Sequence, residues 1–231
     1  MANIRDILRR VNTLTFDCYG TLVDWRAGLR MSLGLCFGEA VAERIDELFD
    51  MYVELEAQVE AETYRSYRQV TAQTVRMMAR RMDLTLPPGR EAALAGALRD
   101  WPLFPDTNAA LVRLKQRYRL GVLSNIDRDL FAGTSRHFQV PFDFVVTAED
   151  VRTYKPAHGH FHRYLEEFGS RETTLHVAQS LYHDGGPANA LGIAYAWINR
   201  YGQSGDDAVA PDVSVPNLAS LADLADESHG H

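Results

Sequence analysis

Residues 13–25 read TLTFDCYGTLVDW, and much of the architecture can be predicted from them. Leu14 and Phe16 predict a buried β-strand, which ends where Asp17 and the turn residue Gly20 follow. The pattern therefore places a carboxylate at the carboxyl end of a strand. Open α/β sheets hold their reactive groups at that edge, so Asp17 is the first candidate for a catalytic residue.

Composition limits the class of protein. The chain has 231 residues, of which 46% are hydrophobic and 24% charged, as is usual for a globular protein that buries a substantial core. The formal net charge is -7, and no basic run is present that would favour a nucleic acid or an anionic membrane surface. A small-molecule substrate is the simpler expectation.

No targeting or membrane segment is expected from the sequence. The first residues, MANIRDILRRVN, lack a long apolar core, and no apolar run elsewhere is long enough to span a bilayer. Cys18 and Cys36 form no CxxC pair, so neither a disulfide framework nor a zinc site is expected. We therefore expect a cytoplasmic protein.

The segment 25–104 shows helical periodicity. Its apolar residues recur at intervals of three and four, which predicts amphipathic helices. The expected helices are Ala27–Phe37, Ala42–Thr63, Arg68–Met82 and Arg90–Trp101. Pro102 and Pro105 close this helical block.

From Pro105 onward the chain alternates between helix and strand, which predicts parallel strands with right-handed crossovers. The expected strands are Leu120–Leu123, Phe142–Val146, Leu175–Ala178, Ala194–Ile198 and Val213–Val215. The expected helices include Asp106–Arg117, Asp127–His137, His158–Phe168 and Gly185–Leu191. We therefore predict an α/β protein whose Rossmann-like parallel-sheet core comprises residues 1–24 and 105–231, with an inserted all-helical domain at residues 25–104.

The pattern hhhhDxxGTLhD, in which h is a strand residue of mainly apolar character, resembles the first motif of the haloacid dehalogenase (HAD) superfamily of hydrolases. The resemblance implies that Asp17 is the nucleophile and that Thr21 helps to hold its carboxylate. It also implies that residues 25–104 are the cap domain of this family. A cap would shield the site from water and so strengthen the electrostatic interactions inside it.

The residue type at the position of Tyr19 differs between two branches of this family. Phosphatases carry a second Asp two residues after the nucleophile, which protonates a poor alkoxide leaving group, and Tyr19 occupies that position here. A phenol with a pKa of about 10 is a weak substitute for that acid. Halide leaves without a proton, so the D-x-Y-G-T variant resembles the type II (S)-2-haloacid dehalogenases, and Trp25 resembles a subgroup of them.

Ser124 and Asn125, in LGVLSNID, follow the second predicted core strand. In the dehalogenases the matching Ser holds the substrate carboxylate and the matching Asn contacts the departing halide. The resemblance therefore assigns these roles to Ser124 and Asn125. An ordinary hydrogen-bonded turn at the end of a strand would contain the same residue types.

Lys155 and Asp184 complete the expected catalytic set. Lys155, in TYKPAHGHF, resembles the family lysine that neutralises and orients the nucleophilic carboxylate, although a solvated lysine at a helix start has the same appearance in sequence. Asp184, in HVAQSLYHDGG, resembles the residue that directs the hydrolytic water in dehalogenases and helps to bind magnesium in phosphatases. Phe161 and His183 are added to the substrate-binding set of Tyr19, Trp25, Ser124 and Asn125.

The sequence departs from the family pattern in its substrate pocket. Phe161 stands where the family has a Tyr, and the segment from Ile45 to Thr63 has no Arg or Lys to clamp a substrate, being rich in Asp and Glu instead. Only Asp184 accompanies Asp17 as a carboxylate for a metal, so we expect neither metal nor cofactor. Magnesium would be needed only by a phosphatase.

The resulting prediction is hydrolytic dehalogenation of a small 2-haloalkanoic acid to the 2-hydroxy acid, through an ester on Asp17. Three alternatives remain open. They are a magnesium-dependent phosphatase, a hydrolase of another small carboxylic acid such as azetidine-2-carboxylate, whose ammonium group an acidic cap would suit, and a non-catalytic binding protein. The expected partner is a small carboxylic acid, with neither nucleic acid nor membrane, and the resemblance leaves a homodimer through the cap open.

Overall fold

The computed structural model describes residues 3–38, 41 and 44–230, and the chain forms two compact units. The first unit comprises Met1–Val23, Leu103–Asn125 and His137–His231. The second comprises Asp24–Pro102 and Ile126–Arg136. Both units are therefore assembled from segments that lie far apart in the sequence.

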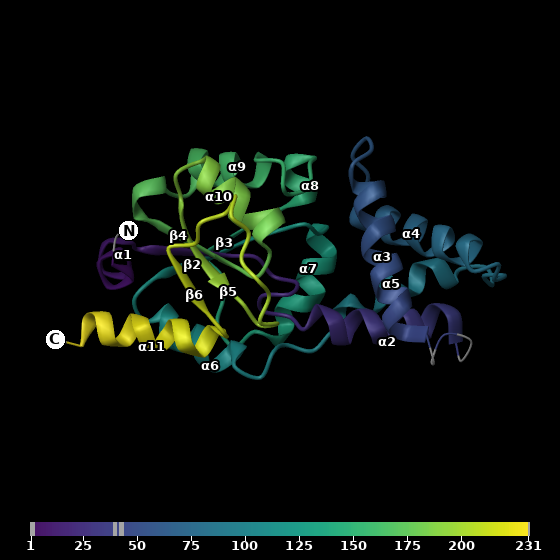
Figure 1. Cartoon of the computed structure of the whole chain (residues 1–231), viewed down its shortest axis with the longest axis horizontal. Helices are drawn as coiled ribbons and strands as arrows, with labels where there is room; N and C mark the ends of the chain where they lie inside the picture. Colours follow the sequence, from purple (N-terminus) through teal and green to yellow (C-terminus); the bar gives the residue numbers. More distant parts are fainter. Residues whose placement is uncertain (1–2, 39–40, 42–43, 231) are drawn as a thin grey trace. The chain divides into compact units, whose positions relative to one another are not determined.

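A six-stranded parallel sheet forms the centre of the first unit (Figure 1). The strands are β1 Thr13–Phe16, β2 Arg119–Ser124, β3 Phe144–Thr147, β4 Thr174–Ala178, β5 Ala194–Ile198 and β6 Val213–Val215. Their order is β3-β2-β1-β4-β5-β6, so β1 is central and pairs with β2 and β4. The predicted α/β fold with a parallel sheet is confirmed.

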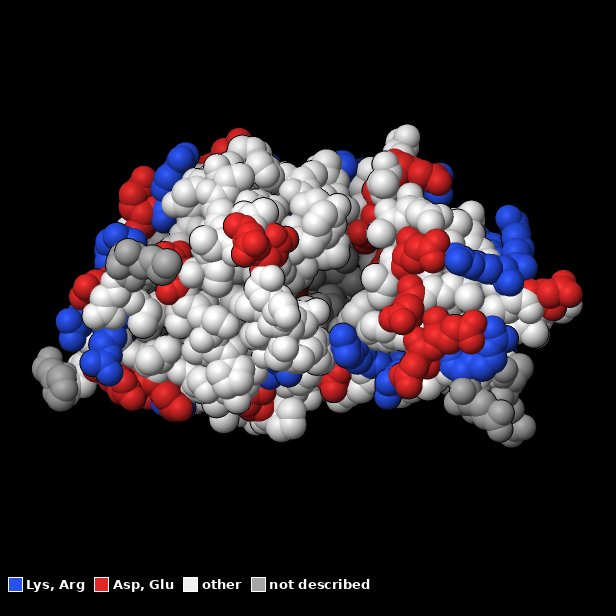
Figure 2. All heavy atoms as spheres, in the orientation of Figure 1, with Lys and Arg blue, Asp and Glu red and all other residues white. Residues whose placement is uncertain are grey.

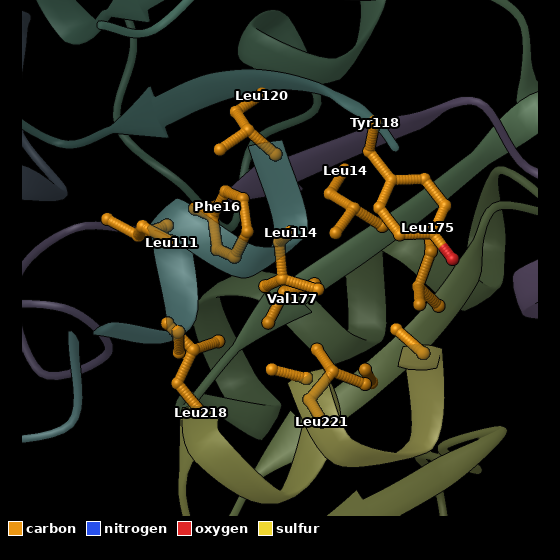
Figure 3. Packing of buried hydrophobic residues seen from close by; sticks show 14 of the residues in the cluster. Leu14, Phe16, Leu111, Leu114, Tyr118, Leu120, Leu175, Val177, Leu218 and Leu221 are labelled. Carbon is orange, nitrogen blue, oxygen red and sulfur yellow. The ribbon is translucent and has the colours of Figure 1, made fainter. Parts of the chain in front are cut away.

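Helices cover both faces of this sheet, as Figure 1 shows. One face is covered by α1 Ile4–Arg10, α6 Thr107–Lys115 and α11 Leu218–His229, and the other by α9 Gly159–Glu167 and α10 Gly186–Ala190. In Figure 3, Leu14 and Phe16 of β1 pack with Leu111, Leu114, Leu218 and Leu221 of the first face. All four residues of β1 are buried, as expected for a central parallel strand. The backbone that leads into Asp17 is thereby held firmly.

Several elements differ from the sequence-based expectation. The helix expected at Arg90–Trp101 is α-helical only over α5 Ala93–Ala97, with a 3₁₀ turn on each side, and α8 Ala148–Val151 was not predicted. The helix expected at Gly185–Leu191 is preceded by a π-helical turn, Leu181–Gly185, and only then continues as α10. The N-terminal helix α1 was not predicted; its first turn is capped by the side chain of Asn3, which accepts a hydrogen bond from the backbone N–H of Arg5. The π-helical turn carries Asp184, so it bears directly on the site.

Helices make up the second unit. They are α2 Trp25–Phe37, α3 Ile45–Glu60, α4 Tyr67–Arg81, α5 Ala93–Ala97 and α7 Arg128–Thr134. The predicted start of the second of these helices, Ala42, lies outside the described residues. In the part of the chain that the structure describes, no helix of either unit combines the length and the apolar character needed to cross a bilayer.

Asp127 explains why α7 belongs to the helical unit. Its buried carboxylate accepts hydrogen bonds from the backbone N–H groups of Tyr67, at 2.7 Å, and Arg68, at 3.0 Å. These groups begin α4 and have no partner inside that helix. A negative charge at this end of the helix also interacts favourably with the helix dipole. Asp127 thus joins the start of α7 to the start of α4.

Three of the six acidic residues of α3 form ion pairs with neighbouring arginines. The ion pairs are Arg30–Asp46, Arg44–Glu47 and Arg81–Glu54. Glu56 differs, because its carboxylate accepts hydrogen bonds from the hydroxyl groups of Tyr52 and Tyr67, both at 2.7 Å. Figure 2 likewise shows Lys and Arg side chains interspersed with Asp and Glu side chains on the face in view.

Candidate active site

Asp17 lies at the carboxyl end of the central strand. Its backbone N–H continues the ladder beyond β1 by donating to the carbonyl of Val177 at 3.1 Å. The residue is only 9% exposed, so its carboxylate depends on protein groups rather than on bulk water. The sequence-based placement of Asp17 at the sheet edge agrees with the structure.

The ammonium group of Lys155 is completely surrounded by acceptors. Its Nζ donates to Asp17 Oδ1 at 3.0 Å, to Asp184 Oδ1 at 2.6 Å and to the carbonyl of Leu123 at 2.8 Å. Burial disfavours its charge, but the two carboxylates outweigh burial and raise the pKa of Lys155. With 1% of the residue exposed, a solvated lysine is excluded.

Asn125 fixes the backbone of Lys155 through two reciprocal hydrogen bonds. The amide Oδ1 of Asn125 accepts from the backbone N–H of Lys155 at 2.7 Å, and its Nδ2 donates to the Lys155 carbonyl at 3.1 Å. The resemblance alone assigned Asn125 to the halide. The structure adds a positioning contact that sequence reasoning did not predict, while one N–H of the amide is left for a ligand.

Thr21 holds the second oxygen of Asp17. Its Oγ1 donates to Asp17 Oδ2 at 2.8 Å and itself accepts from the backbone N–H of Gln179 at 3.0 Å. Gly20 makes the intervening turn possible, because its φ of 101° lies in the region that favours glycine. Burial raises the pKa of Asp17, the Lys155 ammonium lowers it and the Asp184 charge raises it further, the net direction being upward.

Asp184 has one saturated and one bare oxygen. Oδ1 accepts hydrogen bonds from Lys155 and from Nε2 of His176, at 2.9 Å. Oδ2 is buried and has no hydrogen-bond partner among the residues that the structure describes. Burial alone would raise the pKa of Asp184, but the charge of Lys155 and the hydrogen bond from His176 lower it below its usual range. Asp184 is therefore an ionised acceptor with one oxygen left for a ligand.

Ser124 presents a second unsatisfied group at the same sheet edge. It ends β2, and its Oγ is buried without a hydrogen-bond partner within the described part of the chain. Its carbonyl accepts from Nε2 of His160 at 3.1 Å. Buried polar atoms are usually paired, so an unpaired hydroxyl here indicates a place for a ligand acceptor.

The remaining sequence-predicted residues are less closely associated with Asp17. Phe161 is fully buried and packs edge-on against His176, with ring centroids 4.9 Å apart. Its role in substrate binding stays a prediction, whereas its packing against the imidazole is observed. His183 is bound by Ser180, whose Oγ lies 3.2 Å from His183 Nδ1, and burial lowers the pKa of this imidazole.

Tyr19 and Trp25 occupy the two ends of the turn after Asp17. Tyr19 is half-buried and forms an isolated bridge with Val23 in the first unit. Trp25 begins α2 of the second unit, where its ring packs edge-on against Phe49 at 4.8 Å. Their predicted contacts with a substrate remain predictions.

Cys18 does not compete with Asp17 as a nucleophile. It is fully buried, and burial followed by the neighbouring Asp17 charge raises the pKa of its thiol well above the ordinary value. A thiol that stays protonated is a poor nucleophile. Its complete burial is consistent with a packing role.

His176 and His160 are the two site residues that sequence reasoning missed. Both are fully buried, and each contacts a group of the predicted site directly. A signal for His176 was present, because a lone imidazole in the buried strand TLHVA needs polar partners. The identity of the partner could not be read from that signal.

A cationic side chain joins Asp17 to Asp184. Asp17 Oδ1 and Asp184 Oδ1 are bridged by the Lys155 ammonium, which offsets the charge of both carboxylates. Across residues 3–38, 41 and 44–230, no cluster of three or more His, Cys, Asp or Glu side chains is placed to hold a metal ion. The expectation that the site works without a metal stays a prediction.

The sequence of this chain is similar to those of known haloacid dehalogenases. The family model described as haloacid dehalogenase-like hydrolase matches residues 11–192. Haloacetate dehalogenase H-2 of Moraxella sp. (strain B) is 27% identical over 226 residues, which cover 94% of this chain and 99% of that protein. The (S)-2-haloacid dehalogenase of Pseudomonas sp. (strain YL) is 24% identical over 229 residues, covering 95% and 97%.

The fold recurs in solved structures. The L-2-haloacid dehalogenase from Xanthobacter autotrophicus, with chloropropionic acid covalently bound, superposes with a TM-score of 0.81 at 19% sequence identity. The match covers 93% of this chain and 98% of that one. At this level of identity the comparison establishes the shared fold.

Proposed function

This chain belongs to the haloacid dehalogenase-like hydrolase family, and from that premise we propose that it converts small 2-haloalkanoic acids to 2-hydroxy acids by hydrolysis. The observation that carries the proposal is a buried carboxylate, Asp17, held on one oxygen by Lys155 and on the other by Thr21. Relatives that align over nearly the whole chain include a haloacetate dehalogenase and an (S)-2-haloacid dehalogenase.

The first step is a displacement at carbon. A carboxylate oxygen of Asp17 attacks the halogen-bearing carbon from the side opposite the halogen, so that the new C–O bond forms as the C–halogen bond breaks. The halide leaves with the bonding electron pair and needs no proton. Tyr19, in place of the acid that phosphatases carry, is compatible with this chemistry because no alkoxide has to be protonated.

The second step hydrolyses the ester at its acyl carbon. A water near Asp184 Oδ2 transfers a proton to that oxygen while its own oxygen adds to the carbonyl carbon of Asp17. Collapse breaks the bond between the acyl carbon and the alkyl oxygen, and the alkoxide takes the proton to become the hydroxy acid. The Asp17 carboxyl then loses the second proton of the water to solvent, which restores the carboxylate.

The stereochemistry follows from these bonds. Only the first step touches the carbon that bore the halogen, so one inversion is expected overall. Ser124 Oγ, buried and unpaired in the described structure, is the group that can donate to the substrate carboxylate. The remaining N–H of Asn125 is the corresponding candidate for the halide.

We propose that the reaction requires no metal. The Lys155 ammonium contacts both Asp17 and Asp184, so it compensates the charges that a divalent ion would compensate in a phosphatase. The alternative substrate with an ammonium group loses support from α3, because Asp46, Glu47 and Glu54 are paired with arginines.

Halide release from a panel of acids tests the proposal. The panel is chloroacetate, fluoroacetate and both enantiomers of 2-chloropropionate, each assayed with EDTA. We expect halide release that EDTA leaves unchanged, and at least a thousandfold loss, on the order of what removal of a nucleophile costs, in Asp17→Asn.

A parallel assay with p-nitrophenyl phosphate and magnesium provides the control. Magnesium-dependent release of phosphate without any release of halide would reject the dehalogenase and favour the phosphatase. The hydroxy acid formed from the reactive enantiomer should have the opposite configuration, which chiral chromatography measures.

A further inference from the structure

His176 connects Asp184 to the neighbouring central strand. It is fully buried in the middle of β4, where it pairs in register with Thr15 of β1. Its Nδ1 lies 2.9 Å from Thr15 Oγ1 and its Nε2 lies 2.9 Å from Asp184 Oδ1. The imidazole therefore uses both nitrogens, one on each side.

The partners determine which nitrogen carries the proton. An ionised carboxylate only accepts hydrogen bonds, so Nε2, which faces Asp184, carries a proton. When the ring carries no other proton, Nδ1 is an acceptor and the hydroxyl of Thr15 donates to it. The result is a chain of donors that runs from Thr15 through His176 to Asp184.

Aromatic packing prevents the imidazole from turning. Phe161 meets it edge-on, and the ring of Tyr195 is stacked with it at a centroid distance of 6.3 Å. The hydroxyl of Tyr195 is itself anchored, because it donates to the carbonyl groups of Ala178 and Ser180. The direction of the His176 Nε2–H bond is thus set by the core of the first unit.

The consequence for Asp184 is an asymmetry between its two oxygens. Lys155 and His176 both donate to Oδ1, and Oδ2 remains bare in the structure as described. Lys155 alone would not fix this choice, because its ammonium is shared with Asp17 and the carbonyl of Leu123. A rigid donor on the opposite side holds the carboxylate plane.

We propose that His176 is a positioning residue for the ester-hydrolysis step, and that the contact of its Nδ1 with Thr15 helps to hold the ring in place. The inference rests on the proposed function, because it assigns Asp184 Oδ2 to the hydrolytic water. The proton balance is the one given above, and His176 neither gains nor loses a proton in it.

The two steps of the reaction depend on different side chains. Attack on the substrate uses Asp17, Lys155 and Ser124, whereas Asp184 Oδ2 is needed only when water attacks the ester. Loss of the His176 donor should therefore leave halide release in the first turnover nearly unchanged and slow the release of the hydroxy acid. The ester on Asp17 should then accumulate.

Three substitutions separate the two hydrogen bonds of the imidazole. His176→Phe keeps a ring but removes both bonds. His176→Asn retains an acceptor near Nδ1 for Thr15 and loses the donor to Asp184. His176→Gln retains a donor near Nε2 for Asp184, so it is the matched control for the Asn variant.

Steady-state kinetics and intact-protein mass spectrometry give the decisive readouts. For chloroacetate, kcat should fall about tenfold or more in His176→Phe and His176→Asn, with kcat/KM nearly unchanged, because kcat/KM reports only the steps up to halide release. A species heavier by the substrate less hydrogen halide should dominate in these variants, and His176→Gln should restore most of kcat.

Other outcomes reject the proposal in distinguishable ways. If kcat and kcat/KM fall together and no ester accumulates, His176 has only a structural role while the dehalogenase function stands. If His176→Phe does not fold, the comparison of His176→Asn with His176→Gln decides by the same criteria. If the unmodified enzyme releases no halide from any acid of the panel, the proposed function fails and the inference fails with it.

Discussion

A single buried lysine allows two carboxylates to lie close together away from solvent. Lys155 lies 3.0 Å from one carboxylate and 2.6 Å from another, with 1% of its side chain exposed. Each charge would be costly by itself at such a depth, and the three together are tolerated because every donor of the ammonium is used. The proposed nucleophile, Asp17, and the proposed water-directing residue, Asp184, therefore share one cation.

His160 is another buried residue, and it is expected to make the stability of the fold depend on pH. Burial, together with the charge of Lys155, lowers its pKa from 6.5 to about 3. Between these pH values the unfolded chain binds a proton that the folded chain does not, so stability must decrease as the pH falls from 6.5 toward 3.

The substitution His160→Gln tests this prediction. Glutamine does not titrate and keeps a donor for the carbonyl of Ser124, so the pH dependence should flatten by up to about 1.4 kcal/mol per pH unit. Urea unfolding at several pH values between 4 and 6 measures the slope, the range being chosen to lie inside the window of about 3 to 6.5. An identical slope in both proteins would show that His160 titrates normally in the fold.

Among the elements, the start of α4 is the clearest case of a helix end held by a distant residue. Asp127→Ala should lower the free energy of unfolding by about 1–2 kcal/mol, because two backbone N–H groups lose their acceptor and the helix end loses a negative charge. Asp129→Ala is the matched control, since Asp129 makes only an exposed ion pair with Arg68 among the contacts described and should cost less than about 1 kcal/mol. Equal losses in urea unfolding would contradict the capping role.

Sequence reasoning predicted the sheet more reliably than the turns between its strands. The strand before Asp17 contains the apolar residues Leu14 and Phe16, and β2 contains a short apolar run before Ser124. Buried strands leave a signal of this kind in the sequence. The π-helical turn Leu181–Gly185 has no such signal, because its hydrogen bonding depends on how Ser180 and Tyr195 are placed by the fold. The surroundings of Asp184 were therefore not predictable in detail.

For the whole molecule, parallel topology explains why the site could be predicted from separated motifs. Asp17 follows β1, Ser124 ends β2 and Asp184 lies in the turn after β4, and parallel strands bring their carboxyl ends to one edge of the sheet. Contacts between side chains were harder to predict. The bond between His176 and Asp184 and the bond between Tyr67 and Asp127 depend on packing that no local pattern contains.

An oxygen-18 single-turnover experiment tests directly whether Asp17 becomes an ester. Enzyme in excess over substrate would be allowed one turnover in water enriched in oxygen-18, followed by mass spectrometry of the hydroxy acid and of the peptide that contains Asp17. An ester on Asp17 predicts unlabelled hydroxy acid and label in the Asp17 carboxylate, because water attacks the acyl carbon of the ester. Label in the hydroxy acid, with none in the peptide, would show that water attacks the substrate carbon itself and would rule out the ester.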